Sequence, residues 1–85
     1  MLFYDYVPDI LERRGAYRDD HLALIGEWKQ KGALLVAGAL GDPPHGAAFV
    51  FRVGDPGDVE RFAEADPYVA AGLVAARRVE RFAVV

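Results

Sequence analysis

The sequence predicts an α+β domain in which four antiparallel strands form one sheet with the helices on one face. Three observations support this prediction. Runs of apolar and aromatic residues alternate along the chain with two segments of helical pattern. Two of the apolar runs are joined by a short turn, which favours a hairpin. The 85 residues are 53% hydrophobic and 27% charged, which is the composition of one globular domain over residues 1–85.

The chain begins with a strand and a helical region. Residues 2–7 are rich in aromatic side chains and end at Pro8, which is typical of a strand. A short helical turn is predicted over residues 10–14, and a longer helix over residues 18–31. Acidic side chains in the first turn of the longer helix and lysines in its last turn complement the helix dipole, and Gly32 ends it.

Two apolar strands follow and form the predicted hairpin. The unbroken apolar run over residues 33–40 is typical of a strand that is buried on both faces. Residues 41–46 are dense in glycine and proline, which predicts a turn. Residues 47–53 are again strongly apolar and predict the second strand of the hairpin.

The last third of the chain predicts two helices and a strand. Asp55-Pro56 has the pattern of an N-cap and first helical residue. This helix is expected to end near Ala65, because the residue before a proline avoids the α conformation. Asp66-Pro67 begins a further short helix that runs to about Gly72. Residues 77–85 are predicted to form the final strand.

The predicted order of elements is that of the ferredoxin-like βαββαβ fold. Two main helices cover only one face of such a sheet, yet the central strands carry apolar side chains on both faces. A large apolar sheet face in water marks an association site. We therefore expect a homodimer whose sheets pack face to face with two-fold symmetry, as in a dimeric α/β barrel.

The composition argues against several classes of function. The net charge of −3, without a basic run, argues against nucleic-acid binding. No apolar stretch approaches the length of a membrane span, and the first residues do not resemble a signal peptide, so a cytoplasmic protein is expected. The chain has no cysteine, serine or threonine to act as a nucleophile. Its two histidines have no metal-ligand spacing and its glycines form no phosphate loop, so no metal and no cofactor are expected.

His21 and Asp66 are the candidate acid/base residues. His21 lies on the apolar stripe of its predicted helix, so its ring faces the core. Asp66 is expected to cap the helix that starts at Pro67, with one carboxylate oxygen capping and the other free for an imidazole. A carboxylate on one ring nitrogen leaves the other nitrogen as a base near neutral pH. Alternatively, Asp66 is only a cap and His21 a core histidine bound to a backbone carbonyl.

Four further residues are candidates for substrate binding: Tyr68, Arg14, Arg18 and Gly38. Tyr68 either contacts a ligand or is a half-buried ring with its hydroxyl in water. Gly38 lies in an apolar strand, which indicates close backbone approach or a bulge beside a pocket, or merely room for a helix. The two arginines either hold an anionic substrate or lie on a solvated helix face.

Asp5 and His45 have less definite expectations. Asp5 lies among aromatic residues in the first strand, where it can face the dimer interface, pair with an arginine such as Arg81, or line the pocket. His45 lies in the proline-rich turn and is expected to be exposed to solvent.

Several motifs carry a family resemblance. The most specific is Ala65-Asp66-Pro67-Tyr68 followed by Gly72-Leu73, and His21-Leu22 and the run over residues 32–38 add to it. Together they resemble the YCII family of small dimeric ferredoxin-like proteins. The resemblance implies an active site built on a His–Asp pair, a pocket near the sheet, and lyase- or hydrolase-type chemistry on a small molecule. The connection over residues 41–46 is shorter than the loop common in that family.

We therefore expect a small enzyme in which His21, oriented by Asp66, transfers a proton to or from an unidentified small molecule. The alternatives are a non-catalytic homodimer that binds a small ligand in the same cavity, and a module that docks a partner protein.

Overall fold

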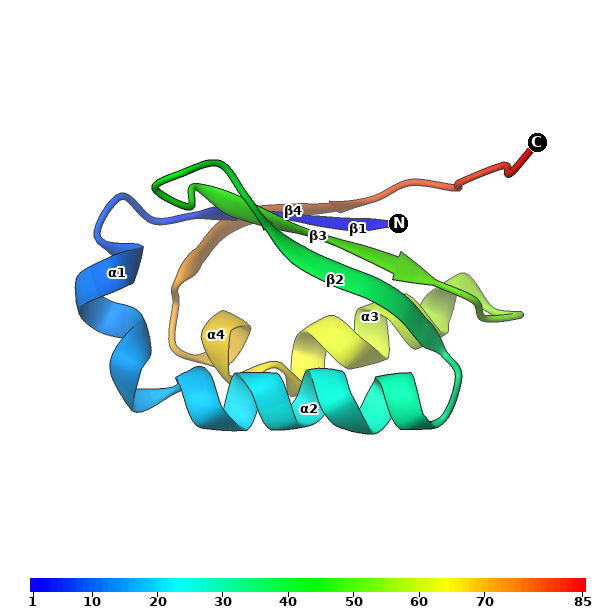
Figure 1. The fold of residues 1–85 in the computed structure, drawn as a ribbon, viewed down its shortest axis with the longest axis horizontal. Helices are drawn as coiled ribbons and strands as arrows, with labels where there is room; N and C mark the ends of the chain where they lie inside the picture. The colour runs from blue at the N-terminus through cyan, green and yellow to red at the C-terminus, as the bar shows by residue number, and fades with distance from the viewer.

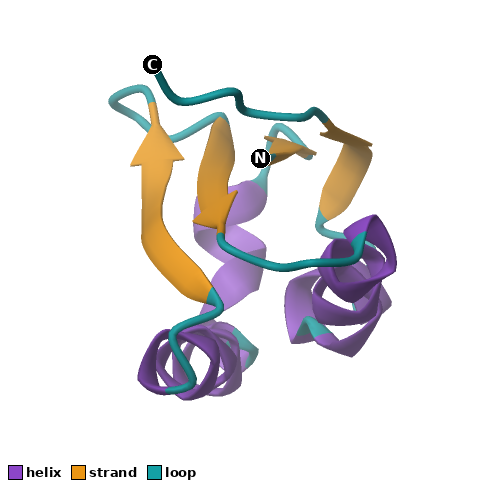
Figure 2. Cartoon of the chain, turned by 90° about the vertical axis from the view of Figure 1, so that its right-hand side faces the viewer, coloured by secondary structure: helices purple, strands orange, loops and turns teal.

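Four antiparallel strands form one sheet, and α2, α3 and α4 lie against one of its faces (Figure 1). The computed structural model describes residues 1–85. Figure 2 shows the strands and the helix layer end-on. The strands are β1 (Leu2–Tyr6), β2 (Leu34–Leu40), β3 (Gly46–Phe51) and β4 (Val74–Val79). The helices are α1 (Ile10–Arg13), the 3-10 turn η1 (Arg14–Ala16), α2 (Arg18–Gln30), α3 (Pro56–Ala65) and α4 (Pro67–Ala70).

The sheet has the strand order β2-β3-β1-β4, and every pair of neighbours is antiparallel. With α2 between β1 and β2, and α3 between β3 and β4, this is the ferredoxin-like βαββαβ fold. The predicted fold class is therefore confirmed. None of the helices is both long and apolar enough to cross a membrane.

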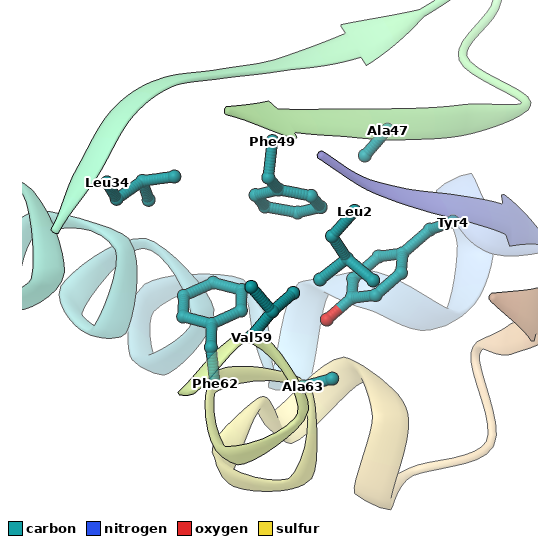
Figure 3. Close-up of a cluster of buried hydrophobic side chains, with 8 residues drawn as sticks. All are labelled: Leu2, Tyr4, Leu34, Ala47, Phe49, Val59, Phe62 and Ala63. Carbon is teal, nitrogen blue, oxygen red and sulfur yellow. The ribbon is translucent and has the colours of Figure 1, made fainter. Parts of the chain in front are cut away.

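The main hydrophobic core lies between the sheet and the helix layer (Figure 3). Alternate side chains of β1 and β3 point toward the helices, as the period of two in a strand requires. The apolar stripe of α3 packs against them at helical spacing. The eight buried residues of this core are Leu2, Tyr4, Leu34, Ala47, Phe49, Val59, Phe62 and Ala63.

The prediction of a final strand over residues 77–85 is wrong at both ends. β4 begins at Val74 and ends at Val79. Its last residue pairs with Leu2, the first residue of β1, and only Glu80 continues the pairing, through a backbone hydrogen bond to Met1, so residues 81–85 have no strand beside them with which to form a ladder. The start of β4 is set by how far β1 extends as a partner, which the apolar pattern of β4 alone does not reveal.

The prediction that β2 is buried on both faces is also wrong for the single chain. β2 is an edge strand, and the helices cover only one side of the sheet. Leu35 and Val36 are consequently 52% and 60% exposed. The opposite face of the sheet therefore carries apolar side chains that no helix covers, and of these Phe3 has the guanidinium of Arg78 over its ring.

Candidate functional site

His21 and Asp66 come together in the buried interior. His21 lies in the second turn of α2, and Asp66 lies between α3 and α4, where it caps α4. The Nδ1 atom of His21 is 2.7 Å from Oδ1 of Asp66. The two residues are 5% and 0% exposed. Because a carboxylate only accepts hydrogen bonds, the Nδ1–H group donates, and Nε2 is the nitrogen left without a proton in the neutral ring.

The carboxylate of Asp66 accepts three hydrogen bonds. Oδ1 accepts from Nδ1 of His21 and, at 3.0 Å, from the backbone N–H of Tyr68, which is the helix cap. Oδ2 accepts from the hydroxyl of Tyr4 at 2.8 Å. The expected division, with one oxygen for the cap and the other for the imidazole, is therefore wrong, because a single oxygen does both. The second oxygen is held by a strand residue that the sequence did not single out.

Tyr4 links the hydrophobic core to this polar cluster. Its ring packs among the core side chains, and Figure 3 shows its hydroxyl oxygen pointing from β1 toward the helix layer. Burial raises the pKa of the Tyr4 hydroxyl well above its ordinary value, and the negative charge of Asp66 raises it further. Tyr4 therefore stays protonated and donates to Asp66 across the neutral range.

Tyr68 lies flat against the ring of His21. The two ring centroids are 3.7 Å apart with an angle of 4° between the planes. The ring of Tyr6 contacts the ring of Tyr68 edge-on, with 6.0 Å between the two centroids. Tyr68 is 3% exposed, so its ring is buried more deeply than the sequence suggested. The stack prevents the imidazole from turning while Asp66 holds one of its nitrogens.

A cavity of about 210 Å³ adjoins this cluster, between the helix-facing side of the sheet and the segment from η1 through α2. Four of the predicted site residues, Arg14, Arg18, Gly38 and Tyr68, line it together with His21. Asp66 is not part of the lining and lies behind His21. The remaining lining residues are Tyr6, Leu22, Ile25, Lys29, Ala37, Ala39, Ala47 and Phe49.

Gly38 lies beside the cavity, but none of the reasons considered above explains it, and the one register shift of β2 lies between Leu34 and Val36, so no bulge lies at Gly38. It is exposed, and a Cβ atom placed on it would meet no atom within 4 Å. Neither a close backbone approach nor a tightly packed helix therefore explains the glycine.

Asp5 and His45 lie outside this site. Asp5 is exposed on the helix-free face of the sheet, makes no ion pair with Arg81 and does not line the cavity. His45 is exposed in the turn between β2 and β3, as predicted.

Sequence reasoning missed Tyr4, Tyr6 and Lys29. For Lys29 a signal was present, because it follows Arg18 by 11 residues and His21 by eight, which places all three along one side of α2. For the two tyrosines only the register of β1 shows which ring faces the helices. No group of three or more histidine or acidic side chains gathers in a way that could hold a metal ion.

Comparisons with known proteins bear on the family and the fold of the chain. The model of the YCII-related domain family matches residues 1–83. Among solved structures, the chain is similar to the 5-chloro-2-hydroxyhydroquinone dehydrochlorinase of Burkholderia phenoliruptrix, determined in complex with 2,5-dihydroxybenzoquinone. The similarity has a TM-score of 0.78 at 29% sequence identity, and it covers 98% of this chain and 94% of the other. A search of curated proteins finds no match.

Proposed function

The chain belongs to the YCII-related domain family, and on that premise we propose that it is a small enzyme in which His21 and Asp66 move a proton on a small molecule. One observation carries the proposal. A histidine that is 5% exposed lines a cavity, and its Nδ1 atom lies 2.7 Å from a fully buried carboxylate. This is the arrangement that prepares an imidazole to act as a base through its other nitrogen.

His21 is the proposed base, and Asp66 is the residue that orients it. Asp66 accepts the Nδ1–H bond and so keeps the proton on that nitrogen. The Nε2 lone pair then takes a proton from the substrate, and the ring becomes an imidazolium. The carboxylate stabilises this cation by its charge, and the face of the Tyr68 ring stabilises it by its π electrons. Tyr4 holds the second carboxylate oxygen in place.

The electron pair left behind needs stabilisation of its own. When a C–H bond of the substrate breaks and its proton goes to Nε2, the bonding pair stays on the substrate. It can move onto a carbonyl oxygen, where the positive charges of Arg14 and Arg18 stabilise the new negative charge, or it can expel a leaving group. Loss of HCl from a hydroxylated chlorinated ring is related to the second course and starts from the keto tautomer, in which the carbon that bears chlorine is tetrahedral. The base takes a ring hydroxyl proton, the O–H bonding pair forms a new C=O bond, the ring double bond shifts, and chloride departs with the C–Cl bonding pair. The similarity to a dehydrochlorinase therefore favours lyase-type over hydrolase-type chemistry.

We also propose that two copies associate through the helix-free face of the sheet. Phe3, Val36 and Val50 lie on that face, and a second copy would remove this apolar surface from water. Sedimentation at micromolar concentration tests this. We expect about twice the chain mass of 9.3 kDa, and a mass near 9.3 kDa would contradict it.

A turnover screen tests the proposed chemistry. Wild type and His21→Ala are incubated with 5-chloro-2-hydroxyhydroquinone and related hydroxylated rings with and without chlorine, following chloride release and ring absorbance. A general base contributes roughly 10²–10⁴-fold in rate, so His21→Ala should lose about that much. His45→Ala is the matched control, because it removes an exposed histidine, and its rate should be unchanged.

Equal rates in wild type and His21→Ala would end the catalytic proposal. A compound that binds in the cavity but is turned over by neither protein would instead support the alternative of a non-catalytic ligand-binding protein.

A further inference from the structure

The charges around the cavity are all of one sign. Arg14, Arg18 and Lys29 line it, and no aspartate or glutamate does, because Asp66 lies behind His21. The chain as a whole has 13 acidic residues against 10 lysines and arginines. A cavity with three cations and no lining carboxylate is therefore opposite in sign to the rest of the molecule.

These three cations are also without ion-pair partners. Five other basic side chains of the chain each pair with an acid on the surface; they are Arg13, Lys31, Arg61, Arg77 and Arg78. Arg14, Arg18 and Lys29 take part in no ion pair. Asp19 and Asp20 are next to Arg18 in sequence, but neither lines the cavity or forms an ion pair. The positive charge at the cavity is consequently available to a ligand.

Two tyrosine hydroxyls add hydrogen-bond donors near the arginines. Tyr6 and Tyr68 both line the cavity, and neither hydroxyl bonds within the protein. No buried polar side-chain atom is left without a partner, so these two hydroxyls are open to the cavity. Burial raises the pKa of both tyrosines, while the positive charges of Arg14 and Arg18 act in the opposite direction. The field of the arginines therefore reaches both hydroxyls.

The rest of the lining is apolar and limits the size of the ligand. Alanines on β2 and β3, with Phe49, form the sheet side of the cavity, and Leu22 and Ile25 form the helix side. The volume of about 210 Å³ lies below the several hundred typical of drug-sized ligands. Lys29 follows Arg18 by 11 residues on α2, or about 16 Å along the axis, so it lies at the far end from the arginines.

We infer that the cavity binds a small flat ring that carries an ionised oxygen, such as a ring carboxylate or phenolate, with that oxygen at Arg14 and Arg18. The arginines and the two tyrosine hydroxyls supply donors for the oxygen, and the apolar walls contact the ring. The placement of the ring beside Nε2 of His21 rests on the proposed function. Binding of the anion does not, because it needs no proton transfer.

A binding titration with matched probes tests the inference. Benzoate and 2,5-dihydroxybenzoquinone are the anions, and benzamide is a neutral ring of nearly the same shape as benzoate. Binding is followed by amide ¹H–¹⁵N shifts at low salt. We expect shifts at the cavity with both anions and at least a tenfold weaker affinity for benzamide. Raising the salt concentration from about 0.05 M to about 0.5 M should weaken the binding of benzoate and leave the affinity for benzamide unchanged.

Substitutions then identify the cations involved. Arg18→Gln should lower the affinity for benzoate about tenfold or more, because it removes a charge-assisted contact. Arg18→Lys, which keeps the charge, should recover part of the loss. Lys29→Gln should have the smaller effect expected of a cation at the far end. Arg52→Gln is the matched control, since Arg52 is an exposed, unpaired cation outside the cavity, and it should bind as wild type does.

His21→Ala separates this inference from the proposed catalysis. If His21→Ala and wild type both bind benzoate and neither turns over any compound, the catalytic proposal fails and the anion site stands. If benzamide binds as tightly as benzoate, if no anion binds, or if Arg18→Gln binds as wild type does, the anion site is wrong, whatever the turnover screen gives.

Discussion

The space between sheet and helices contains two regions built on different principles. At one end, Phe49, Phe51 and Phe62 pack with ring centroids between 5.2 and 6.4 Å apart. At the other end, Asp66 is held by three hydrogen bonds of 2.7 to 3.0 Å. The aromatic region is stabilised by many weak contacts, each of which contributes a small amount of free energy. The polar region has few hydrogen bonds, and each one is the only hydrogen bond of its buried donor.

Tyr4 belongs to both regions and connects them. Its ring packs edge-on against the ring of Phe49, with 4.9 Å between the two centroids, and its hydroxyl donates a hydrogen bond to Asp66. Substitutions in the aromatic region should therefore alter stability in proportion to the volume removed. In the polar region a single atom is enough to disturb the orientation of His21, with little change in volume.

The largest expected effect is in the aromatic region. Phe62→Ala removes a fully buried ring and leaves a cavity, so the free energy of unfolding should fall by about 3–5 kcal/mol in urea titration. Phe62→Leu should lower the free energy of unfolding markedly less than Phe62→Ala does. Phe82→Ala is the matched control, because Phe82 is 56% exposed. Similar losses for Phe62→Ala and Phe82→Ala would mean that this core is not where the stability lies.

A smaller effect is expected from one atom in the polar region. Tyr4→Phe keeps the ring and leaves Oδ2 of Asp66 buried without a donor, which should cost about 1–3 kcal/mol of unfolding free energy. Tyr17→Phe is the control, since Tyr17 is 39% exposed and makes no side-chain hydrogen bond. If both substitutions are neutral, the hydroxyl of Tyr4 does not support the carboxylate.

The sequence could single out His21 and Asp66 as candidates because both signals are local, whereas their pairing was implied by the resemblance to the YCII family. A histidine on the apolar stripe of a helix and an aspartate before a proline are visible without knowledge of the fold. The role of Tyr4 depends on the register of β1 against its neighbours, and the length of β4 depends on where β1 ends. Such long-range pairing is not encoded in the pattern of one strand, because apolar alternation alone does not select the partner.

The smallest expected effect concerns alkaline pH. Burial raises the pKa of Tyr6 from its ordinary value of 10.0 to about 12. Below pH 10 this tyrosine is protonated in both the folded and the unfolded chain, so it does not change stability. Above pH 10 the unfolded chain loses its proton first, so stability falls as the pH rises toward 12. Tyr6→Phe should make this decline shallower, and an identical decline in Tyr6→Phe and wild type would contradict the assignment.

The proposed role of Asp66 depends most directly on which nitrogen of His21 carries the proton. Long-range ¹H–¹⁵N spectra of the two histidine rings, recorded where the rings are neutral, report this tautomer. We predict that His21 has its proton on Nδ1, held by Asp66, with Nε2 bare, whereas the exposed His45 exchanges between tautomers as free imidazole does. A proton on Nε2 of His21, or the same exchange as in His45, would contradict the claim that Asp66 prepares His21 as a base.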